Sequence, residues 1–400
     1  MITDKILAEK VALETNSGYW SVNNTYFLNK AECLRYATQI KEYNVQFHYF
    51  DSFYSSLTWK NEPSETLEEL YKRRAQQLRE KYDYIILAYS GGADSCNVLN
   101  SFLNNGIPID DIVTSYPVRA IEKLKPFFNK KDRKASNLIF EFSEAAEPKL
   151  KEVARKHPNV KISILDHTET AIDLLSDSKL HIMPVAGIGA SPSLAGHYLI
   201  AQKVREYSER GGKAVLLTGV DKPRMGFNPA NKKFGVWFDD ITLVWGNHVN
   251  EAHSGYKPAT EHFYYSLDMP EIWQKQCHIM RRTMEPIVNL DERPDFYNDI
   301  HYKSYRGNEV FYVHNMFFKK ILYKDWTEDI FQAEKPSGYF FQEHSDWFFK
   351  TNLTDQRTKD FHYGQVMEFV SGIDPRFIVY DDTGKPLKFT EMQTKVITIS

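Results

Sequence analysis

The sequence contains little cysteine and no pair of neighbouring cysteines. Its 400 residues include three cysteines, Cys33, Cys96 and Cys277, which lie far apart in the chain. This number and spacing exclude a disulfide framework and the C-x-x-C pairs that hold metal ions or carry redox chemistry. We therefore expect an intracellular protein, located in the cytoplasm, or in the host cytoplasm if the protein is viral.

Long apolar runs and a strong charge imbalance are also absent. No stretch approaches the roughly 18 apolar residues that a membrane-spanning helix needs, and the first residues, "MITDKILAEKVALE", lack the apolar centre of a secretory signal. The formal net charge is −3, which indicates neither a membrane partner nor a nucleic acid partner, although it is compatible with a local basic patch. The histidines show no spacing typical of zinc ligands, so we predict no zinc site.

The composition is that of an ordinary soluble globular protein, with 42% hydrophobic and 26% charged residues. The length predicts two or three domains. Aromatic residues make up 14% of the chain, which favours bulky aromatic cores over a surface that stacks on bases. We predict an N-terminal helical and mixed extension at 1–80, a central domain at 81–285 and an aromatic-rich domain at 286–400.

Predicted strands and helices alternate between residues 80 and 225. The pattern predicts strands at 83–90, 109–117, 160–168 and 213–220, and helices at 63–82, 94–106, 146–159 and 191–212. Pro63 is the expected first residue of its helix. This alternation predicts an α/β fold with a doubly wound parallel sheet. Beyond it we expect a flexible loop at 226–235, a short hairpin at 236–246 and a helix at 266–284 that Ser266 caps.

The stretch "YDYIILAYSGGADSCNVLNSFL", residues 82–103, contains two glycines between an apolar strand and a helix. Ligands of parallel sheets bind at the carboxyl ends of strands. Glycines there let backbone N–H groups approach an anion, and the helix N-terminus adds partial positive charge. The loop lacks the lysine of a Walker A motif and does not match G-x-G-x-x-G. Asp94 is out of place beside phosphate unless a divalent cation lies between them.

The loop does match S-G-G-x-D-S, through Ser90, Gly91, Gly92, Asp94 and Ser95. It resembles the PP-loop of the ATP pyrophosphatase superfamily, also called adenine nucleotide α-hydrolases, which includes asparagine, GMP and NAD synthetases. The resemblance covers residues 80 to 225, with weaker support to 285. It implies that these five residues bind the pyrophosphate end of ATP, with Mg²⁺ on Asp94. A plain glycine turn is the alternative.

The resemblance extends to the end of the second predicted strand. In the superfamily the adenine ring lies against this region, where Ser115 and Tyr116 stand in this chain. We therefore assign both residues to ATP binding. An ordinary strand end explains them equally well.

The end of the last predicted strand, "LLTGVDKPRM", stands where asparagine synthetases carry a G-x-x-x-D element, but Gly219 and Asp221 are closer together than in that element. The resemblance implies that Gly219 contacts ATP and that Asp221 is a second magnesium ligand. Lys222 and Arg224 would meet pyrophosphate or a substrate carboxylate, and with Asp94 they are the predicted catalytic residues. A solvated charged turn is the alternative.

Two further stretches carry weaker signals. The glycine-rich segment 185–199 is either a second anion or substrate site or a capped helix start. Segment 261–278 resembles a part of asparagine-synthetase-like proteins of phages. Its Asp268 and its aromatic residues form either a wall of the acceptor site or a packed helix start; the aromatic residues are Phe263, Tyr264 and Tyr265. Cys96, in the helix after the loop, is expected to be packed rather than reactive.

The sequence also lacks features of particular superfamily branches. Residue 2 is Ile2 rather than the nucleophilic cysteine of a glutaminase domain, and no cysteine pair is present for sulfur transfer. We expect an AMP-forming ligase that transfers AMP from ATP to an acceptor oxygen, with Mg²⁺ as cofactor. The acceptor is a small molecule or a nucleobase. A nucleotide-binding protein without adenylation, one that modifies nucleic acid, and a non-enzymatic protein with a vestigial site are the alternatives. The oligomeric state is not indicated.

Overall fold

The computed structural model describes residues 2–15, 17–127, 141–176, 194–220, 222–228, 232–240, 258–288, 303–304, 311–312, 315–326 and 346–399. The structural statements below concern these residues. Within them, none of the helices is long and apolar enough to cross a membrane.

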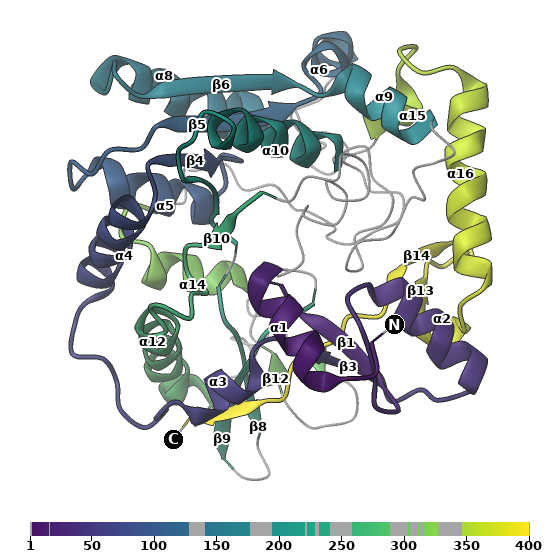
Figure 1. Cartoon of the computed structure of the whole chain (residues 1–400), viewed down its shortest axis with the longest axis horizontal. Coiled ribbons are helices and arrows are strands. Elements are labelled where there is room, and N and C mark those ends of the chain that lie inside the picture. The colour runs from purple at the N-terminus through teal and green to yellow at the C-terminus, as the bar shows by residue number, and fades with distance from the viewer. Residues whose placement is uncertain are drawn as a thin grey trace.

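The centre of the molecule is a five-stranded parallel sheet, which confirms the predicted α/β class (Figure 1). Its strands are β4 (Tyr84–Ala88), β5 (Asp111–Tyr116), β6 (Lys161–Asp166), β7 (Ala214–Thr218) and β10 (Thr260–His262). Their order is β10-β7-β4-β5-β6. The chain therefore starts in the middle, adds β5 and β6 on one side and returns to add β7 and β10 on the other. This is a Rossmann-like arrangement.

Helices cover both faces of this sheet. On one face lie α4 (Leu67–Lys81), α5 (Ala93–Leu103) and α8 (Glu147–Lys156); on the other lies α10 (Leu194–Ser208). Helix α9 (Thr168–Ser176) follows β6 and packs against the start of α10. Successive residues of β4 point to opposite faces, as a strand requires. Ile85 packs in the core with Val98 of α5, whereas Ile86 packs with Val204 of α10. A strand buried on both faces reads as a continuous apolar run, which is why β4 was predictable.

The helix before β4 starts later than predicted. It begins after Thr66, whose side chain accepts from the backbone N–H of Glu69 at 3.2 Å, while the Glu69 carboxylate accepts from the Thr66 N–H at 2.8 Å. This capping box, rather than Pro63, fixes the first turn. Ser266 likewise does not cap α12 (Glu271–Val288); its hydroxyl accepts from the N–H of Asp268 in a turn that precedes the helix.

A second, antiparallel sheet lies below the first in Figure 1. It has the order β11-β12-β8-β9-β15 and consists of β11 (Lys303–Ser304), β12 (Phe311–Tyr312), β8 (Arg224–Asn228), β9 (Lys233–Trp237) and β15 (Ile397–Ile399). The prediction of a loop at 226–235 was wrong, since β8 and β9 form a hairpin there. Gly226 and Gly235 are partners in the ladder, and a Cβ on Gly235 would lie 2.3 Å from Val396. These glycines allow close packing rather than mark a loop.

The N-terminal part contains α1 (Lys5–Thr15), α2 (Lys30–Ile40), α3 (Asp51–Ser56) and an antiparallel sheet of β1 (Tyr19–Val22), β2 (Thr25–Phe27) and β3 (Gln46–His48). Later elements are α6 (Val118–Leu124), the π-helix η2 (Glu141–Ala146), α14 (Asn315–Leu322), α15 (Asp346–Lys350), α16 (Gln356–Ser371), β13 (Ile378–Tyr380) and β14 (Pro386–Phe389). The Trp20 indole donates to Asp240 at 3.0 Å, and β15 pairs with β9. The domain boundaries at 80 and 285 stay predictions, although these contacts cross both.

Candidate functional site

The strand order of the parallel sheet singles out the carboxyl ends of β4 and β7. The connection from β4 runs to one side of the sheet and β7 starts the other side, so these two strands form the topological switch point where ligands of such sheets bind. Residues 90–95, which we name the glycine loop, follow β4. Gly219 follows β7, and a Cβ there would lie 3.0 Å from the Cα of Ser95. The two loops therefore meet backbone against backbone.

The two glycines of the glycine loop have different surroundings. Gly91 has φ +84°, and a Cβ on it would lie 2.8 Å from the backbone nitrogen of Ala146. The fold itself therefore requires Gly91. Gly92 has φ −71° and ψ 162°, which any residue adopts. A Cβ on Gly92 would meet only Ser90 Oγ at 3.3 Å and Glu141 Oε1 at 4.0 Å. The contact with Ser90 Oγ is tight, so the Ser90 side chain would have to shift slightly to admit a Cβ on Gly92, whereas at Gly91 the obstacle is backbone.

Helix α5 starts in the glycine loop without a side-chain cap. Gly92 is its N-cap residue and has no side chain to accept from the first N–H groups. The hydroxyl of Ser95 donates instead to the Gly92 carbonyl at 3.1 Å, and the Tyr116 hydroxyl donates to the Ser90 carbonyl at 2.6 Å. Ser95 and Tyr116, two of the predicted site residues, thus stabilise the loop through hydrogen bonds to its backbone. The N–H groups at the start of α5 remain directed toward an incoming acceptor, which favours an anion.

Asp94, in the first turn of α5, receives side chains from distant parts of the chain. Lys222 Nζ lies 2.5 Å from its Oδ1, and the Tyr323 hydroxyl donates to the same oxygen. The Tyr264 hydroxyl donates to the Asp94 backbone carbonyl at 2.9 Å. The Lys222 side chain is 1% exposed, whereas that of Asp94 is 23% exposed. Among the described residues none bonds to Oδ2 of Asp94, so one carboxylate oxygen faces solvent.

The other predicted residues after β7 have separate positions. Arg224, on β8, donates through Nε to Asp239 at 2.6 Å. Burial raises the pKa of Asp239 to about 6, although the positive charge of Arg224 opposes this rise. Arg224 is thus held by its own carboxylate partner in the second sheet. Asp221, the predicted second magnesium ligand, lies outside the described residues.

The end of β5 contributes a serine and histidine pair. Ser115 Oγ lies 3.0 Å from Nδ1 of His167, which follows β6, and a Cβ on Gly196 of α10 would lie 3.0 Å from the same hydroxyl. Burial lowers the pKa of His167 to about 3, so the ring is neutral. The pair supplies neutral hydrogen-bonding groups at the sheet edge beside the glycine loop.

The aromatic residues of segment 261–278 are packed in the core. Phe263, Tyr264 and Tyr265 are all buried, and only Tyr264 reaches the glycine loop, through its hydroxyl. Asp268 pairs with Lys81 of α4 at 3.0 Å. The packed helix start, one of the two interpretations of this segment, accounts for these contacts. Of segment 185–199, residues 185–193 lie outside the described residues.

Sequence patterns did not indicate several residues that border the glycine loop. Glu141 is buried in the π-helix η2 near Gly92, and π-helical turns are frequent at functional sites. Asn97 donates to the Tyr264 hydroxyl at 2.9 Å. Tyr323 is 229 residues from Asp94 in sequence, so no local motif connects them.

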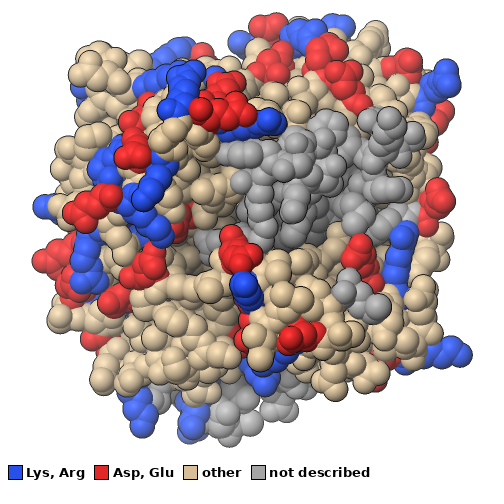
Figure 2. Space-filling view, viewed as in Figure 1, with Lys and Arg blue, Asp and Glu red and all other residues tan. Residues whose placement is uncertain are grey.

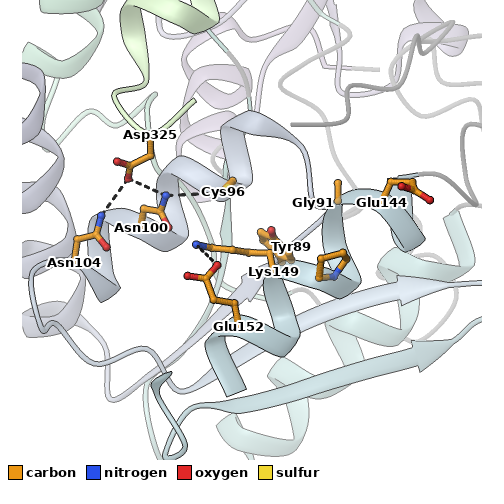
Figure 3. A pocket seen from close by; sticks show the side chains of 11 residues that line it. Tyr89, Gly91, Cys96, Asn100, Asn104, Glu144, Lys149, Glu152 and Asp325 are labelled. Atoms are coloured by element: carbon orange, nitrogen blue, oxygen red, sulfur yellow. Dashed lines mark hydrogen bonds and ion pairs between the residues drawn. The ribbon is translucent and has the colours of Figure 1, made fainter. Parts of the chain in front are cut away.

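A pocket of about 490 Å³ lies between α5 and α8, and Gly91 forms one end of it (Figure 3). The side-chain amides of Asn100 and Asn104 donate to Asp325 Oδ2 at 2.9 Å and 3.1 Å. Cys96 also lines the pocket; it is half-buried, and burial raises the pKa of its thiol. The size is within the range of small-molecule sites.

Asp94 fits one of the ways in which proteins bind Mg²⁺. No group of three or more His, Cys, Asp or Glu residues that could hold a metal ion occurs in the described ranges. Mg²⁺ is commonly held by one or two carboxylates together with substrate phosphates and water. The open Oδ2 of Asp94 beside an anion-binding loop fits this mode of binding.

Charges of both signs are intermixed on the face of the molecule shown in Figure 2, over α4, α5 and α8. This face shows no broad basic stripe of the kind that binds a nucleic acid backbone. No protein-family model matches the chain, and no curated protein matches its sequence.

Proposed function

We propose that the protein binds MgATP at the glycine loop and transfers AMP to an acceptor oxygen, with release of pyrophosphate. The observation that carries the proposal is the start of α5: it has no side-chain cap, it lies at the switch point of a parallel sheet, and its N-cap residue is a glycine. The full S-G-G-x-D-S match, which resembles the PP-loop, supports this site. The absence of a Walker lysine supports attack at the α-phosphorus.

In this proposal the acceptor oxygen bonds to the α-phosphorus, and the bond from that phosphorus to the oxygen bridging to the β-phosphorus breaks. Pyrophosphate leaves with the electron pair. The N–H groups at the start of α5 hold the leaving phosphates and stabilise their growing charge. Bound Mg²⁺ would neutralise phosphate charge through Asp94. Lys222 keeps the Asp94 carboxylate neutralised before the nucleotide arrives, and it is close enough to the loop to contact phosphate afterwards.

Product analysis tests the reaction. With ATP labelled on the α-phosphate and a panel of small carboxylates and nucleobases as acceptors, the label should appear in AMP or in an AMP–acceptor adduct, with one pyrophosphate per turnover. ADP and inorganic phosphate as the products would rule out attack at the α-phosphorus. The nucleotide site itself would then be tested by direct measurement of ATP binding.

A second candidate is a nucleotide-binding protein without adenylation. The specific observation in its favour is the Asp94–Lys222 pair at 2.5 Å, which satisfies the charge of the carboxylate without a metal ion. Under this hypothesis ATP binds with an affinity that does not depend on Mg²⁺. A titration of α,β-methylene-ATP, which resists cleavage between the α and β phosphates, with and without Mg²⁺ distinguishes the two candidates.

A further inference from the structure

The chain segment at the end of α14 is held against α4 and α5 in three places. The Tyr71 hydroxyl donates to the Leu322 carbonyl at 3.2 Å. The Tyr323 hydroxyl donates to Asp94 Oδ1. Asp325 accepts from the Asn100 and Asn104 amides, as Figure 3 shows. Residues 322–325 thus run along the flank of the helix that starts in the glycine loop.

The contacts of Asp94 are unequal between its two oxygens. Tyr323 and Lys222 both approach Oδ1, from different elements, and no residue in the described part of the chain bonds to Oδ2. Two partners on one oxygen fix the rotation of the carboxylate about its last torsion, which is otherwise broad. The direction of the remaining oxygen, Oδ2, is then fixed as well, at a side chain that is partly exposed. A carboxylate oriented by outer partners in this way is typical of metal ligands.

Tyr323 is well suited to hold this orientation. Its side chain is 1% exposed, so its hydroxyl needs a partner inside the protein. Lys222 Nζ lies 5.5 Å from the centre of the Tyr323 ring, so the tyrosine contacts both members of the ion pair. If Lys222 moves toward phosphate, Tyr323 still bonds to Oδ1. Of the two partners, the tyrosine is the one that can act in both states.

We infer that Tyr323 is a positioning residue that directs Oδ2 of Asp94 toward a divalent cation, and that the segment 322–325 is therefore part of the nucleotide site. The inference rests on the proposed function. The hydrogen bonds from Asn100 and Asn104 to Asp325 then have a role in the site, because they fix the segment that carries Tyr323. The sequence analysis predicts this segment in a separate domain at 286–400.

The test is the Mg²⁺ dependence of α,β-methylene-ATP binding, measured by isothermal titration calorimetry without turnover. Tyr323→Phe removes only the hydroxyl and should raise the Mg²⁺ concentration for half-maximal binding by about 10-fold. Tyr71→Phe is the matched control: it loses a hydroxyl bonded to the same segment but not to Asp94, and its Mg²⁺ dependence should equal that of the parent. Asp325→Ala, which releases the segment, should shift the Mg²⁺ dependence in the same direction as Tyr323→Phe.

The outcomes separate the inference from the proposed function. A parent protein that binds the analogue with Mg²⁺, together with an unchanged Mg²⁺ dependence in Tyr323→Phe, overturns the positioning role and leaves the proposed function standing. An equal shift in Tyr323→Phe and Tyr71→Phe also overturns it, because the effect is then a general loosening of the segment. A parent that does not bind the analogue at any Mg²⁺ concentration overturns both.

Discussion

Among the lysine–aspartate pairs in the described part of the chain, two lie in opposite settings. Lys30 and Asp240 lie 2.6 Å apart with both side chains 0% exposed, and both oxygens of Asp240 accept, from the Trp20 indole at 3.0 Å and the Met392 N–H at 3.1 Å. Lys222 and Asp94 lie 2.5 Å apart, with Asp94 partly exposed. A fully satisfied carboxylate has no capacity left for a ligand, so the first pair is structural. The second keeps one oxygen open, which is what a binding site needs.

The largest expected effect comes from breaking the buried pair. Asp240→Asn keeps the shape of the side chain but leaves the Lys30 charge buried without a counter-charge, and it should reduce the free energy of unfolding by about 3–5 kcal/mol. Urea denaturation measures this loss. Binding of α,β-methylene-ATP by the folded fraction should be unchanged. A loss below about 1 kcal/mol would show that the pair is not structural in the sense argued here.

Asp239, the neighbour of Asp240, adds a pH test of the same region. Burial raises the pKa of Asp239 to about 6, above its value in an unfolded chain, so the folded state binds the proton more tightly. This group therefore stabilises the fold at pH below 4, and the stabilisation is lost as the pH rises toward 6. Its upper bound is about 3 kcal/mol for a shift of about two units.

The measurement is the unfolding free energy of the parent and of Asp239→Asn between pH 3.5 and pH 7. The difference between parent and variant should fall through this interval, since only the parent carries the titrating group. A difference that stays constant, or that rises with pH, would mean that Arg224 overcomes the effect of burial and holds Asp239 ionised throughout.

In the Lys222–Asp94 pair, loss of the carboxylate should affect ligand binding more than stability. Asp94→Asn also removes the carboxylate partner of the buried Lys222 ammonium, but Asp94 is partly exposed and water can reach this side of the pair, so the unfolding free energy should fall less than in Asp240→Asn, by about 1–3 kcal/mol. The Mg²⁺-dependent affinity for α,β-methylene-ATP should fall by about 100-fold, as expected when a metal ligand loses its charge. Equal affinity in parent and variant, at several Mg²⁺ concentrations, would remove Asp94 from the site.

The two pairs also show which features of the fold and the site can be predicted from the sequence. The strand and helix alternation and the glycine loop depend on local patterns, and the described parallel sheet confirmed the fold class. Lys222 and Asp94 were each assigned to the site, but their pairing depends on how β7 and β4 lie side by side. Tyr323 reaches Asp94 of the loop, and His167 reaches Ser115, only through tertiary packing, which no local pattern encodes. The glycines of β8 and β9 were misread because a glycine in a strand and a glycine in a loop look alike without the partner strand.

The smallest effect on stability, and the sharpest test of the glycine loop, is expected from Gly92→Ser. Gly92 has extended dihedral angles, and a Cβ there would require only that the Ser90 hydroxyl, 3.3 Å away, shift slightly. Serine is a better N-cap than glycine by a few tenths of a kcal/mol, which offsets this cost. Stability should therefore stay the same or rise slightly. The new hydroxyl would accept from the N–H groups at the start of α5, which in the proposed function hold phosphate. The affinity for α,β-methylene-ATP should fall about 10-fold, a difference of about 1.4 kcal/mol.

The same substitution one residue earlier is the matched control for Gly92→Ser. At Gly91, φ is +84° and a Cβ would lie 2.8 Å from the Ala146 backbone, so Gly91→Ser should reduce the unfolding free energy by about 1–3 kcal/mol. The two variants together separate a glycine that the fold needs from a glycine that the ligand needs. If Gly92→Ser binds the analogue as tightly as the parent does, the phosphates lie elsewhere. If it loses as much stability as Gly91→Ser, both glycines serve the fold, and Gly92 no longer supports a nucleotide site.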